Sequence, residues 1–316
     1  MADKIKIGIS SCLLGNKVRY DGGHKRDPFI TATLGRYLDF VPVCPEAETG
    51  LGIPREAMRL VGDPDRPRLM TVRTGIDQTE RMARWAEIRL PELEQEDLCG
   101  FIFKSDSPSS GMERVKVYGE TGIPEKKGVG IFARLFMEHF PLLPVEEEGR
   151  LQDPVLREHF IERLFVFKRW REMLKRRPGR GALVAFHARH KYLLLAHSPK
   201  HYQELGKWVA RSKDVARPFW YSHYQERLSE ALRRKATPKK QVNVLLHLLG
   251  YFKKELSADE KKEALEIIAD YGKGTVPLIV AVTLINHYVR KYDQGYLADQ
   301  YYLHPHPLEL QLRNHV

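Results

Sequence analysis

The sequence predicts two domains of different class: an α/β domain over residues 1–150 and an all-α domain over residues 151–316. In the first half, short β-rich runs alternate with helical stretches. This is typical of a Rossmann-like fold, with a mostly parallel sheet and helices on both faces. From Asp153 onward the apolar residues recur at helical spacing and no strand pattern is found, so we expect a helical bundle. The length of 316 residues also exceeds the usual size of a single domain.

The elements expected in the first domain alternate along the chain. Strands are predicted over residues 5–9, 40–43, 100–104 and 142–146, and helices over 29–38, 77–95 and 129–139. Gly and Pro are concentrated at residues 50–55 and 62–67, which indicates surface loops. The acidic turn at residues 146–149 is expected to end the domain.

The second domain opens with a clear helix start. Asp153 is a favoured N-cap and Pro154 suits the first helical position, so a long helix is predicted toward Arg176. Further helices are expected between breaks at residues 178–179, 198–199, 217–218, 237–238 and 272–277. Ser257 is expected to cap the helix over residues 258–271.

The charge is distributed unevenly. The chain has a net charge of +11, and residues 151–316 hold 30 Lys and Arg against 17 Asp and Glu, whereas the first 150 residues hold 22 against 24. A domain with such a basic excess attracts phosphate backbones, so nucleic acid is the leading partner class. The alternative is that these cations only solvate helix surfaces.

Composition also restricts where the chain acts. We find no apolar run long enough for a signal peptide or a membrane span, and we expect a soluble cytoplasmic protein. Three cysteines cannot form a disulfide framework. In a reducing compartment, cysteines in turn-like loops are ligands or nucleophiles, or else buried small hydrophobic residues.

Three polar loops each follow a predicted strand. They contain Ser10-Ser11-Cys12, Cys44-Pro45-Glu46 and Ser107-Pro108-Ser109-Ser110-Gly111. Because the carboxyl ends of parallel strands meet at one edge of a sheet, we expect these loops to surround one ligand. Two thiols at that edge are ready ligands for iron or another soft metal, and the third loop is where a further ligand is expected.

The motifs around these loops resemble the thiouracil desulfurase family over most of residues 5–140. The resemblance rests on Ser-Ser-Cys-Leu-Leu-Gly at residues 10–15, Val-Cys-Pro-Glu at 43–46 and Lys-Ser-Asp-Ser-Pro-Ser-Ser-Gly at 104–111. It implies a [4Fe-4S] cluster held by three cysteines, whose fourth iron is free to bind the sulfur of the substrate. The basic helical half resembles the companion domain of longer members, which look like tRNA 4-thiouridine desulfidases.

One position departs from the family pattern. The family's third loop reads Ser-Pro-Ser-Cys-Gly, so Ser110 stands where the third cysteine ligand is expected, beside Cys12 and Cys44. A serine hydroxyl is a harder and less acidic donor than a thiol, so we expect the cluster to be partly or wholly absent. Cys99 lies near the opposite end of a predicted strand and is expected to be structural.

The resemblance also implies roles for nearby residues. Glu46 is expected to activate the water that attacks the thiocarbonyl carbon, and Ser107 to relay a proton or to hydrogen-bond the base. The loops contribute four further side chains that either hold a base edge or phosphate or form loop salt bridges: Arg19, Tyr20, Arg55 and Lys104.

The helical half supplies candidate tRNA contacts, since structured RNA is recognised largely by its shape and phosphates. These are Lys168, Arg169, Arg171, Lys175, Arg176, Arg177, Arg180, Arg189, Lys191, Arg233, Arg234, Lys235, Lys239 and Lys240. His304 and His306 lack a Cys or carboxylate at ligand spacing, so no metal site is expected there. Residues 296–302 are expected to be a packing segment.

Three functions follow from these observations. The first is a tRNA 4-thiouridine desulfidase. The second is a desulfurase for free 2- or 4-thiouracil, which has no need of the basic half. The third is a non-catalytic tRNA-binding protein, which Ser110 favours.

Overall fold

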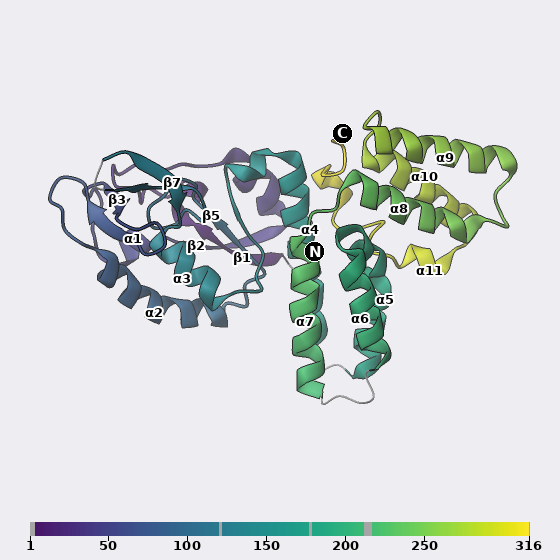
Figure 1. Cartoon of the computed structure of the whole chain (residues 1–316), viewed down its shortest axis with the longest axis horizontal. Coiled ribbons are helices and arrows are strands. Elements are labelled where there is room, and N and C mark those ends of the chain that lie inside the picture. The colour runs from purple at the N-terminus through teal and green to yellow at the C-terminus, as the bar shows by residue number, and fades with distance from the viewer. Residues whose placement is uncertain (1–3, 120–121, 177–178, 212–216, 316) are drawn as a thin grey trace. The chain divides into compact units, whose positions relative to one another are not determined.

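The computed structural model describes residues 4–119, 122–176, 179–211 and 217–315 (Figure 1). Strands are concentrated before residue 150 and helices after it, as the sequence predicts. No helix in these ranges is long and apolar enough to cross a membrane.

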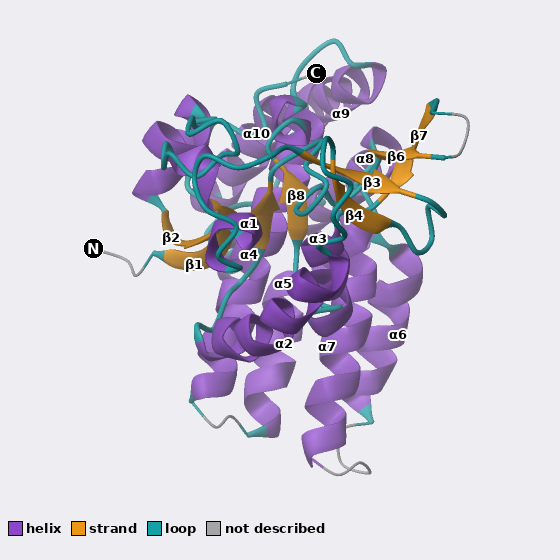
Figure 2. Ribbon diagram, turned by 90° about the vertical axis from the view of Figure 1, so that its left-hand side faces the viewer, coloured by secondary structure: helices purple, strands orange, loops and turns teal. Residues whose placement is uncertain are grey.

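The first part of the chain is built on a parallel sheet of four strands. These are β1 (Ile5–Ser10), β2 (Leu38–Val43), β5 (Phe101–Phe103) and β8 (Val145–Glu147), in the order β2-β1-β5-β8 (Figure 2). Every pair is parallel, and β1 and β2 are in register from Ile5 opposite Leu38 to Ser10 opposite Val43. The predicted parallel sheet is confirmed, and all four strands end at the same edge.

Helices α2 (Thr79–Gln95) and α3 (Ile131–His139) pack on each other, and α3 packs on this sheet. The aromatic rings of Phe101 and Phe103 contact Phe132 and Phe136 of α3, and all four side chains are buried. Such ring pairs add about 0.5–1.5 kcal/mol beyond burial of their area. This aromatic core fixes the end of α3 that faces the third loop.

The helix expected over residues 29–38 is instead two short turns. A π turn spans Phe29–Thr33 and a 3-10 turn spans Leu34–Arg36. The hydroxyl of Thr31 donates to the carbonyl of Asp27 at 2.9 Å, and Gly35 follows, so regular α-helix is disfavoured here.

A second, smaller sheet was not predicted. It consists of β3 (Met58–Val61), β4 (Arg68–Thr71), β6 (Val115–Tyr118) and β7 (Pro124–Gly128), in the order β4-β3-β6-β7. The strands have four or five residues, of which only one or two are buried in each strand. Runs this short carry too little periodicity to be recognised from sequence. The loop predicted at residues 62–67 connects β3 to β4.

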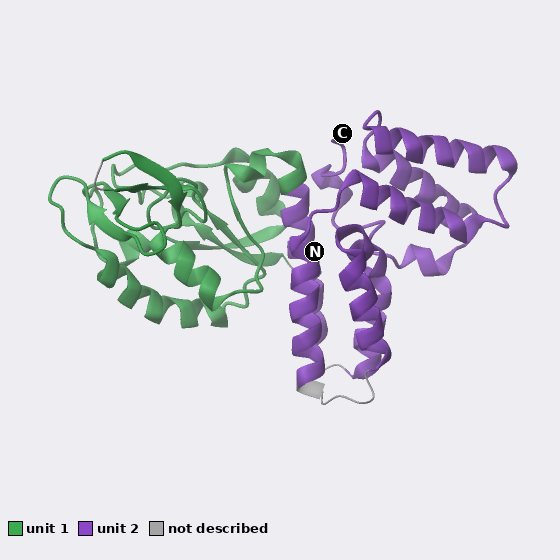
Figure 3. Ribbon diagram, in the orientation of Figure 1, with its two compact units in different colours: residues 1–156 green, residues 157–316 purple. Residues whose placement is uncertain are grey.

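The chain divides into two compact units, residues 1–156 and 157–316 (Figure 3). The acidic turn expected to end the first domain lies a few residues before this division. Helix α1 (Pro45–Glu48) completes the first unit.

The second unit is helical, as predicted. Helix α4 (Pro154–Lys175) begins in the first unit, and Asp153 Oδ1 accepts from the N–H of Val155 at 2.8 Å, which confirms the N-cap. A capping box formed by Ser257 and Glu260 confirms the start of α9. The remaining helices are α5 (Arg180–His197), α6 (Pro199–Ala210), α7 (Arg217–Arg233), α8 (Pro238–Leu249), α9 (Ala258–Lys273), α10 (Leu278–Lys291) and α11 (Gly295–Ala298).

The core of the second unit is largely aromatic. The rings of Trp170 and Tyr224 stack with centroids 5.3 Å apart, and both are almost fully buried, as is Trp220. Buried leucines of α5 and α8 surround them. The unit therefore has a core of its own.

Candidate active site

The three polar loops meet at a cavity of about 430 Å³ at the carboxyl edge of the parallel sheet. Cys12 follows β1, Cys44 follows β2, and the serine loop follows β5, and all three contribute lining residues. This volume lies within the range of small-molecule sites. The expectation that these loops surround one site is confirmed.

The first loop turns back as a 3-10 helix, Ser11–Leu14, immediately after β1. Gly15 ends it with φ +98°, a conformation that a side chain disfavours. The carbonyl of Cys12 accepts from the N–H of Lys25 at 2.9 Å, which folds the following segment over the cavity. This segment brings Arg19 and Tyr20 to the cavity wall.

The second loop places Cys44 at the N-cap of α1. Its thiol lies 3.7 Å from the carbonyl oxygen of Val18, and its N–H donates to Glu48 Oε1 at 2.7 Å. Burial raises the pKa of Glu48 above its usual value. The sequence analysis did not single out Glu48, although it lies on the same turn as Glu46.

The third loop is fixed by the start of α3. The carbonyl of Ser109 accepts from the N–H groups of Phe132 and Ala133 at 2.9 and 3.1 Å, and that of Gly111 accepts from Gly130 at 2.7 Å. A Cβ at position 130 would lie 2.6 Å from the backbone of Ser109, so only glycine permits this approach. The loop conformation is therefore set by backbone contacts and not by its side chains.

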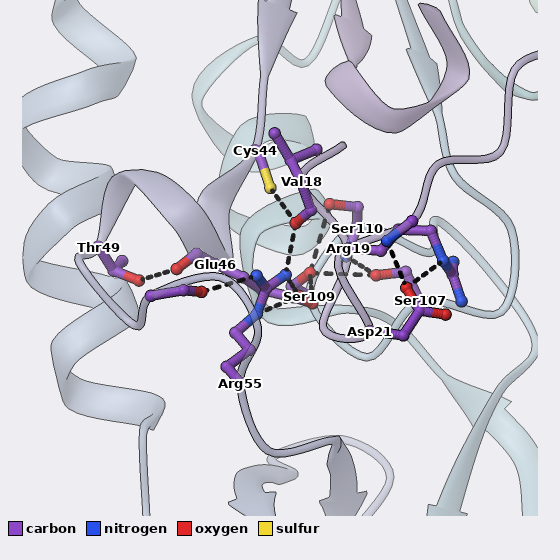
Figure 4. Close-up of polar contacts among 12 residues, drawn as sticks. Val18, Arg19, Asp21, Cys44, Glu46, Thr49, Arg55, Ser107, Ser109 and Ser110 are labelled. Atoms are coloured by element: carbon purple, nitrogen blue, oxygen red, sulfur yellow. Dashed lines mark hydrogen bonds and ion pairs between the residues drawn. The ribbon is translucent and has the colours of Figure 1, made fainter. Parts of the chain in front are cut away.

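A hydrogen-bonded chain of side chains crosses the cavity (Figure 4). The hydroxyls of Ser107 and Ser109 lie 3.0 Å apart, and Ser109 donates to Glu46 Oε1 at 2.8 Å. Arg55 pairs with Glu46 Oε2 and donates to the carbonyl of Val18 at 3.0 Å. Ser107 and Glu46, the two predicted catalytic residues, are thus joined through Ser109, which the sequence analysis left without a role.

Ser110 is buried and lines the cavity beside this chain. Its hydroxyl lies 3.4 Å from that of Ser109, and its N–H donates to Ser107 Oγ at 3.1 Å. The structure therefore places a hydroxyl where the family pattern has a thiol. Cys99, which precedes β5, is buried and is absent from the cavity lining, as predicted.

Two of the four predicted substrate contacts are held by carboxylates. Arg55 is engaged by Glu46, and Lys104 Nζ pairs with Glu148, which follows β8. Glu148 also accepts from the hydroxyl and the N–H of Ser105, at 2.7 Å each. These cations support the carboxylates and the loop, so their charges are partly neutralised before a ligand enters.

Arg19 and Tyr20 have a different environment. The guanidinium of Arg19 lies over the ring of Tyr20 at 5.4 Å and 3.6 Å from Asp21, and Tyr20 is 43% exposed. An exposed ring backed by a cation at the cavity wall can stack on a heterocycle.

The donor set fits an iron–sulfur cluster at two positions of three. Cys12 and Cys44 supply thiols, and Ser110 supplies a hydroxyl from the third loop. Burial and the nearby Cys44 raise the pKa of Cys12 to about 11, and burial raises that of Cys44, so binding of a cluster must displace both protons. No group of three or more His, Cys, Asp or Glu side chains that could hold a metal ion is found in the described ranges.

Comparison with known proteins agrees with this geometry. Residues 7–148 match the family model of 2-thiouracil desulfurase. This match spans nearly the whole of the first unit. Residues 191–307 match a second family, described as a protein of unknown function, DUF1722.

The chain is also similar to a curated protein and to a solved structure. Uncharacterized protein YbgA of Escherichia coli (strain K12) is 31% identical over 153 residues, which is 48% of this chain and 90% of YbgA, and this extent places both in one family. The solved structure of the [4Fe-4S]-dependent thiouracil desulfidase TudS is 29% identical, with a TM-score of 0.39. The alignment covers 48% of this chain and 95% of the TudS chain.

The predicted tRNA contacts fall into two groups in the second unit. Eight of them are exposed: Lys175, Arg176, Arg180, Arg189, Arg233, Arg234, Lys235 and Lys239. Arg189 lies 3.3 Å from Asp299. Arg177 lies outside the described residues.

The other five predicted contacts are only partly exposed. Arg169 donates to His190 at 3.1 Å and to the carbonyl of Pro305 at 3.0 Å, and it lies over the ring of Tyr301, so it serves the interior of the unit and not its surface. Lys240 donates to the carbonyls of His197 and Lys235 at 2.8 and 2.9 Å. The remaining three are Lys168, Arg171 and Lys191. Lys168 lies 3.6 Å from Glu172, and Arg171 is half-buried. The ammonium group of Lys191 lies over the rings of Tyr192 and Tyr296.

Proposed function

We propose that this chain is a desulfidase that converts 4-thiouridine in tRNA to uridine. The observation that carries this proposal is the meeting of Cys12, Cys44 and Ser110 at one cavity, beside Glu46 and Ser107. The match of residues 7–148 to the 2-thiouracil desulfurase family model supports the reaction class. The basic excess of residues 151–316 supports RNA as the carrier of the base.

The proposed reaction is a hydrolysis without net oxidation or reduction. Water supplies the oxygen that replaces sulfur at C4, the carbon–sulfur bond breaks, and sulfur leaves as sulfide. A [4Fe-4S] cluster held by Cys12 and Cys44, with Ser110 at the third position, would supply a Lewis acid with affinity for sulfur.

The chain's own side chains supply the proton transfers. Glu46 accepts the proton of the attacking water, and Arg55 holds its carboxylate in place. Ser107 donates to the base and regains its proton through Ser109, which is hydrogen-bonded to both Ser107 and Glu46. Tyr20, backed by Arg19, stacks on the base at the cavity wall.

The target base must leave its stack to reach this cavity, because the lining is formed by three loops and half-buried side chains. The exposed cations of the second unit would bind phosphates of the same tRNA. Two further functions are distinguishable. A cavity formed within the first unit also suits free thiouracil, and a hydroxyl at position 110 suits a protein that binds tRNA without catalysis.

The test compares the native chain with a Ser110→Cys variant after anaerobic reconstitution with iron and sulfide. Both are incubated with 4-thiouridine tRNA and with free 4-thiouracil at low and high salt, and loss of the thiolated base is measured. We expect the variant to act on tRNA in a salt-sensitive way, faster than the native chain. If sulfur is removed from free 4-thiouracil as fast as from tRNA, and the rate does not depend on salt, the free-base desulfurase is favoured. If neither protein removes sulfur while both bind tRNA, the desulfidase proposal fails.

A further inference from the structure

The small sheet of the first unit, formed by β3, β4, β6 and β7, has one buried face and one exposed face (Figure 2). Leu60 lies opposite Leu69 on β4 and opposite Val117 on β6, and all three side chains are almost fully buried. Because side chains alternate between the two faces along a strand, their neighbours in the chain lie on the other face, here called the outer face. The outer face includes Arg59, Val61, Arg68, Lys116, Tyr118 and Lys126.

Four of these residues are cations that lie close together. Lys116 lies directly opposite Lys126 in the pairing of β6 with β7. The guanidinium of Arg59 lies 4.9 Å from the centre of the ring of Tyr118, which follows Lys116 on the same face of β6. These three cations and Arg68 are exposed, and none of the four forms an ion pair within the described part of the chain. The outer face therefore has a concentrated positive charge that the chain does not compensate.

The acidic side chains nearest in the pairing lie at the two edges of the sheet and have partners of their own. Asp77 forms an isolated bridge with Met70 of β4, and its Oδ1 accepts from the N–H of Thr79 at 2.9 Å. Glu125, on the edge strand β7, pairs with Lys127 at 2.7 Å. Neither carboxylate is paired with a cation of the outer face.

The position of these cations is unfavourable for the fold by itself. Like charges directly opposite each other, as at Lys116 and Lys126, destabilise a pair of strands. The basic face also does not follow from composition, because the first 150 residues hold 22 Lys and Arg against 24 Asp and Glu. Both observations indicate a surface that faces a polyanion.

The central strands of the small sheet begin beside the candidate active site. Met58, the first residue of β3, lines the cavity, and β6 begins at Val115, shortly after the serine loop. A strand rises about 3.3 Å per residue, so β3 carries the outer face no further than about 10 Å from Met58 along the strand. A strand of RNA on this face therefore lies next to the cavity that would receive its base.

We propose that the outer face of the small sheet binds the phosphates of the tRNA strand that carries the target base. Arg59 and Lys116 are the central contacts, with Arg68 and Lys126 on either side. The inference rests on the proposed function and adds a tRNA contact surface on the first unit to the candidate contacts of the second. A lipid surface is disfavoured, because no described outer-face residue is one of the Trp, Phe or Leu side chains with which proteins insert into membranes.

The test measures tRNA binding by the full native chain and by an Arg59→Gln/Lys116→Gln double variant, at several salt concentrations. We expect the slope of log K against log salt to fall by between one and two, and the affinity at about 0.1 M salt to fall about tenfold or more. The matched control is Arg84→Gln/Lys127→Gln, which removes two exposed cations of the first unit that are paired with Glu80 and Glu125. It should change neither quantity, and an equal effect of both double variants would overturn the proposal in favour of net charge alone.

Thermal unfolding separates binding from folding. Lys116→Gln relieves the repulsion with Lys126, so its Tm should not fall. A lower Tm with unchanged tRNA affinity would overturn the proposal, because the cations would then serve the sheet. Vesicles of an anionic phospholipid provide the other polyanion. Vesicle binding that the Arg59→Gln/Lys116→Gln variant loses, with its tRNA affinity unchanged, would assign the face to a membrane instead.

These outcomes are distinct from failure of the proposed function. If the native chain binds tRNA and the Arg59→Gln/Lys116→Gln variant binds it with the same salt slope, the outer face is not a tRNA surface, and the desulfidase proposal stands. If the variant binds tRNA more weakly but no sulfur is removed by the native chain or by Ser110→Cys, the desulfidase proposal fails and the binding surface stands. Absence of tRNA binding by the native chain would overturn both.

Discussion

Ser109 Oγ donates a hydrogen bond to Glu46 Oε1 at 2.8 Å and so joins the loop after β5 to the loop after β2. Because the hydroxyl of Ser107 lies 3.0 Å from that of Ser109, the three side chains form a continuous path for a proton.

Replacing Ser109 by alanine in the Ser110→Cys background should interrupt the path. We expect kcat for sulfur removal to fall about 100-fold, the low end of general acid–base effects, with little change in KM. Steady-state assays over a range of 4-thiouridine tRNA concentrations measure both constants. Ser105→Ala is the matched control, because Ser105 lines the same cavity but bonds to Glu148. Equal losses in both variants would contradict a relay through Ser109.

Arg55→Met should destabilise the first unit. The side chains of Arg55 and Glu46 are only 4% and 16% exposed, so removal of one partner leaves a buried charge. We expect the free energy of unfolding to fall by about 3 kcal/mol in urea titrations. Arg84→Met breaks an exposed pair with Glu80 and should cost under about 1 kcal/mol. A similar loss for both would show that burial of the pair is not what matters.

Gly130→Ala should disturb the third loop directly. The added Cβ would lie 2.6 Å from the backbone of Ser109, and overpacking of this kind costs about 1–3 kcal/mol. Thermal unfolding measures the loss. Gly119→Ala, where no atom lies within 4 Å, should be nearly neutral. An unchanged Tm for Gly130→Ala would mean that the loop moves freely against α3.

The second unit should lose stability in acid. Burial and the charge of Lys191 lower the pKa of His187 to about 4, and burial and the charge of His197 lower that of His159 to about 3. Both rings are therefore neutral in the fold, whereas in the unfolded chain they gain protons below about pH 6.5. Between about pH 6.5 and 4 the unfolded state binds more protons, so stability falls as the pH is lowered.

The slope is at most about 1.4 kcal/mol per pH unit for each histidine, and less for the partly exposed His187. Urea unfolding at pH 7, 6 and 5 measures it. His187→Gln should flatten the slope, and His247→Gln, at an exposed position, should not. A slope that is the same in all three proteins would refute the assignment to His187.

The exposed cations of the second unit should set the salt dependence of tRNA binding. Replacing Lys235 and Lys239 together by glutamine should reduce the slope of log K against log salt by between one and two, if each contacts a phosphate. Binding titrations at several salt concentrations measure the slope. The Lys261→Gln and Lys262→Gln pair on α9, outside the predicted contacts, should leave it unchanged.

The sequence alone predicts the parallel sheet and the loops at its edge, because strand periodicity and loop composition are local properties. Cys12, Cys44 and the serine loop were expected at one edge, and they line one cavity. The small sheet escaped prediction because its two hairpins, β3 with β4 and β6 with β7, are joined by a non-local pairing of β3 with β6. Its strands are also too short to be recognised individually.

The missed site residues have the same cause. Ser109 gains its role only because a glutamate 63 positions earlier lies within hydrogen-bond distance. Glu148 was expected to belong to a terminal acidic turn, yet it pairs with Lys104 because β8 lies beside β5. Arg169 lies in a basic stretch of the sequence and was expected on the surface, but its position on α4 directs its side chain to His190 and Tyr301. The residue type gives the charge of a side chain, whereas its burial depends on which face of the helix it occupies.

The backbone hydrogen bonds between the start of α3 and the serine loop have an evolutionary consequence. Since backbone groups of Gly130, Phe132 and Ala133 hold that loop, the side chain at position 110 contributes little to its shape. A codon change there exchanges one atom, oxygen for sulfur, within an otherwise unaltered frame. A lineage can therefore give up the third thiol and later regain it in a single mutational step, without passing through a misfolded ancestor.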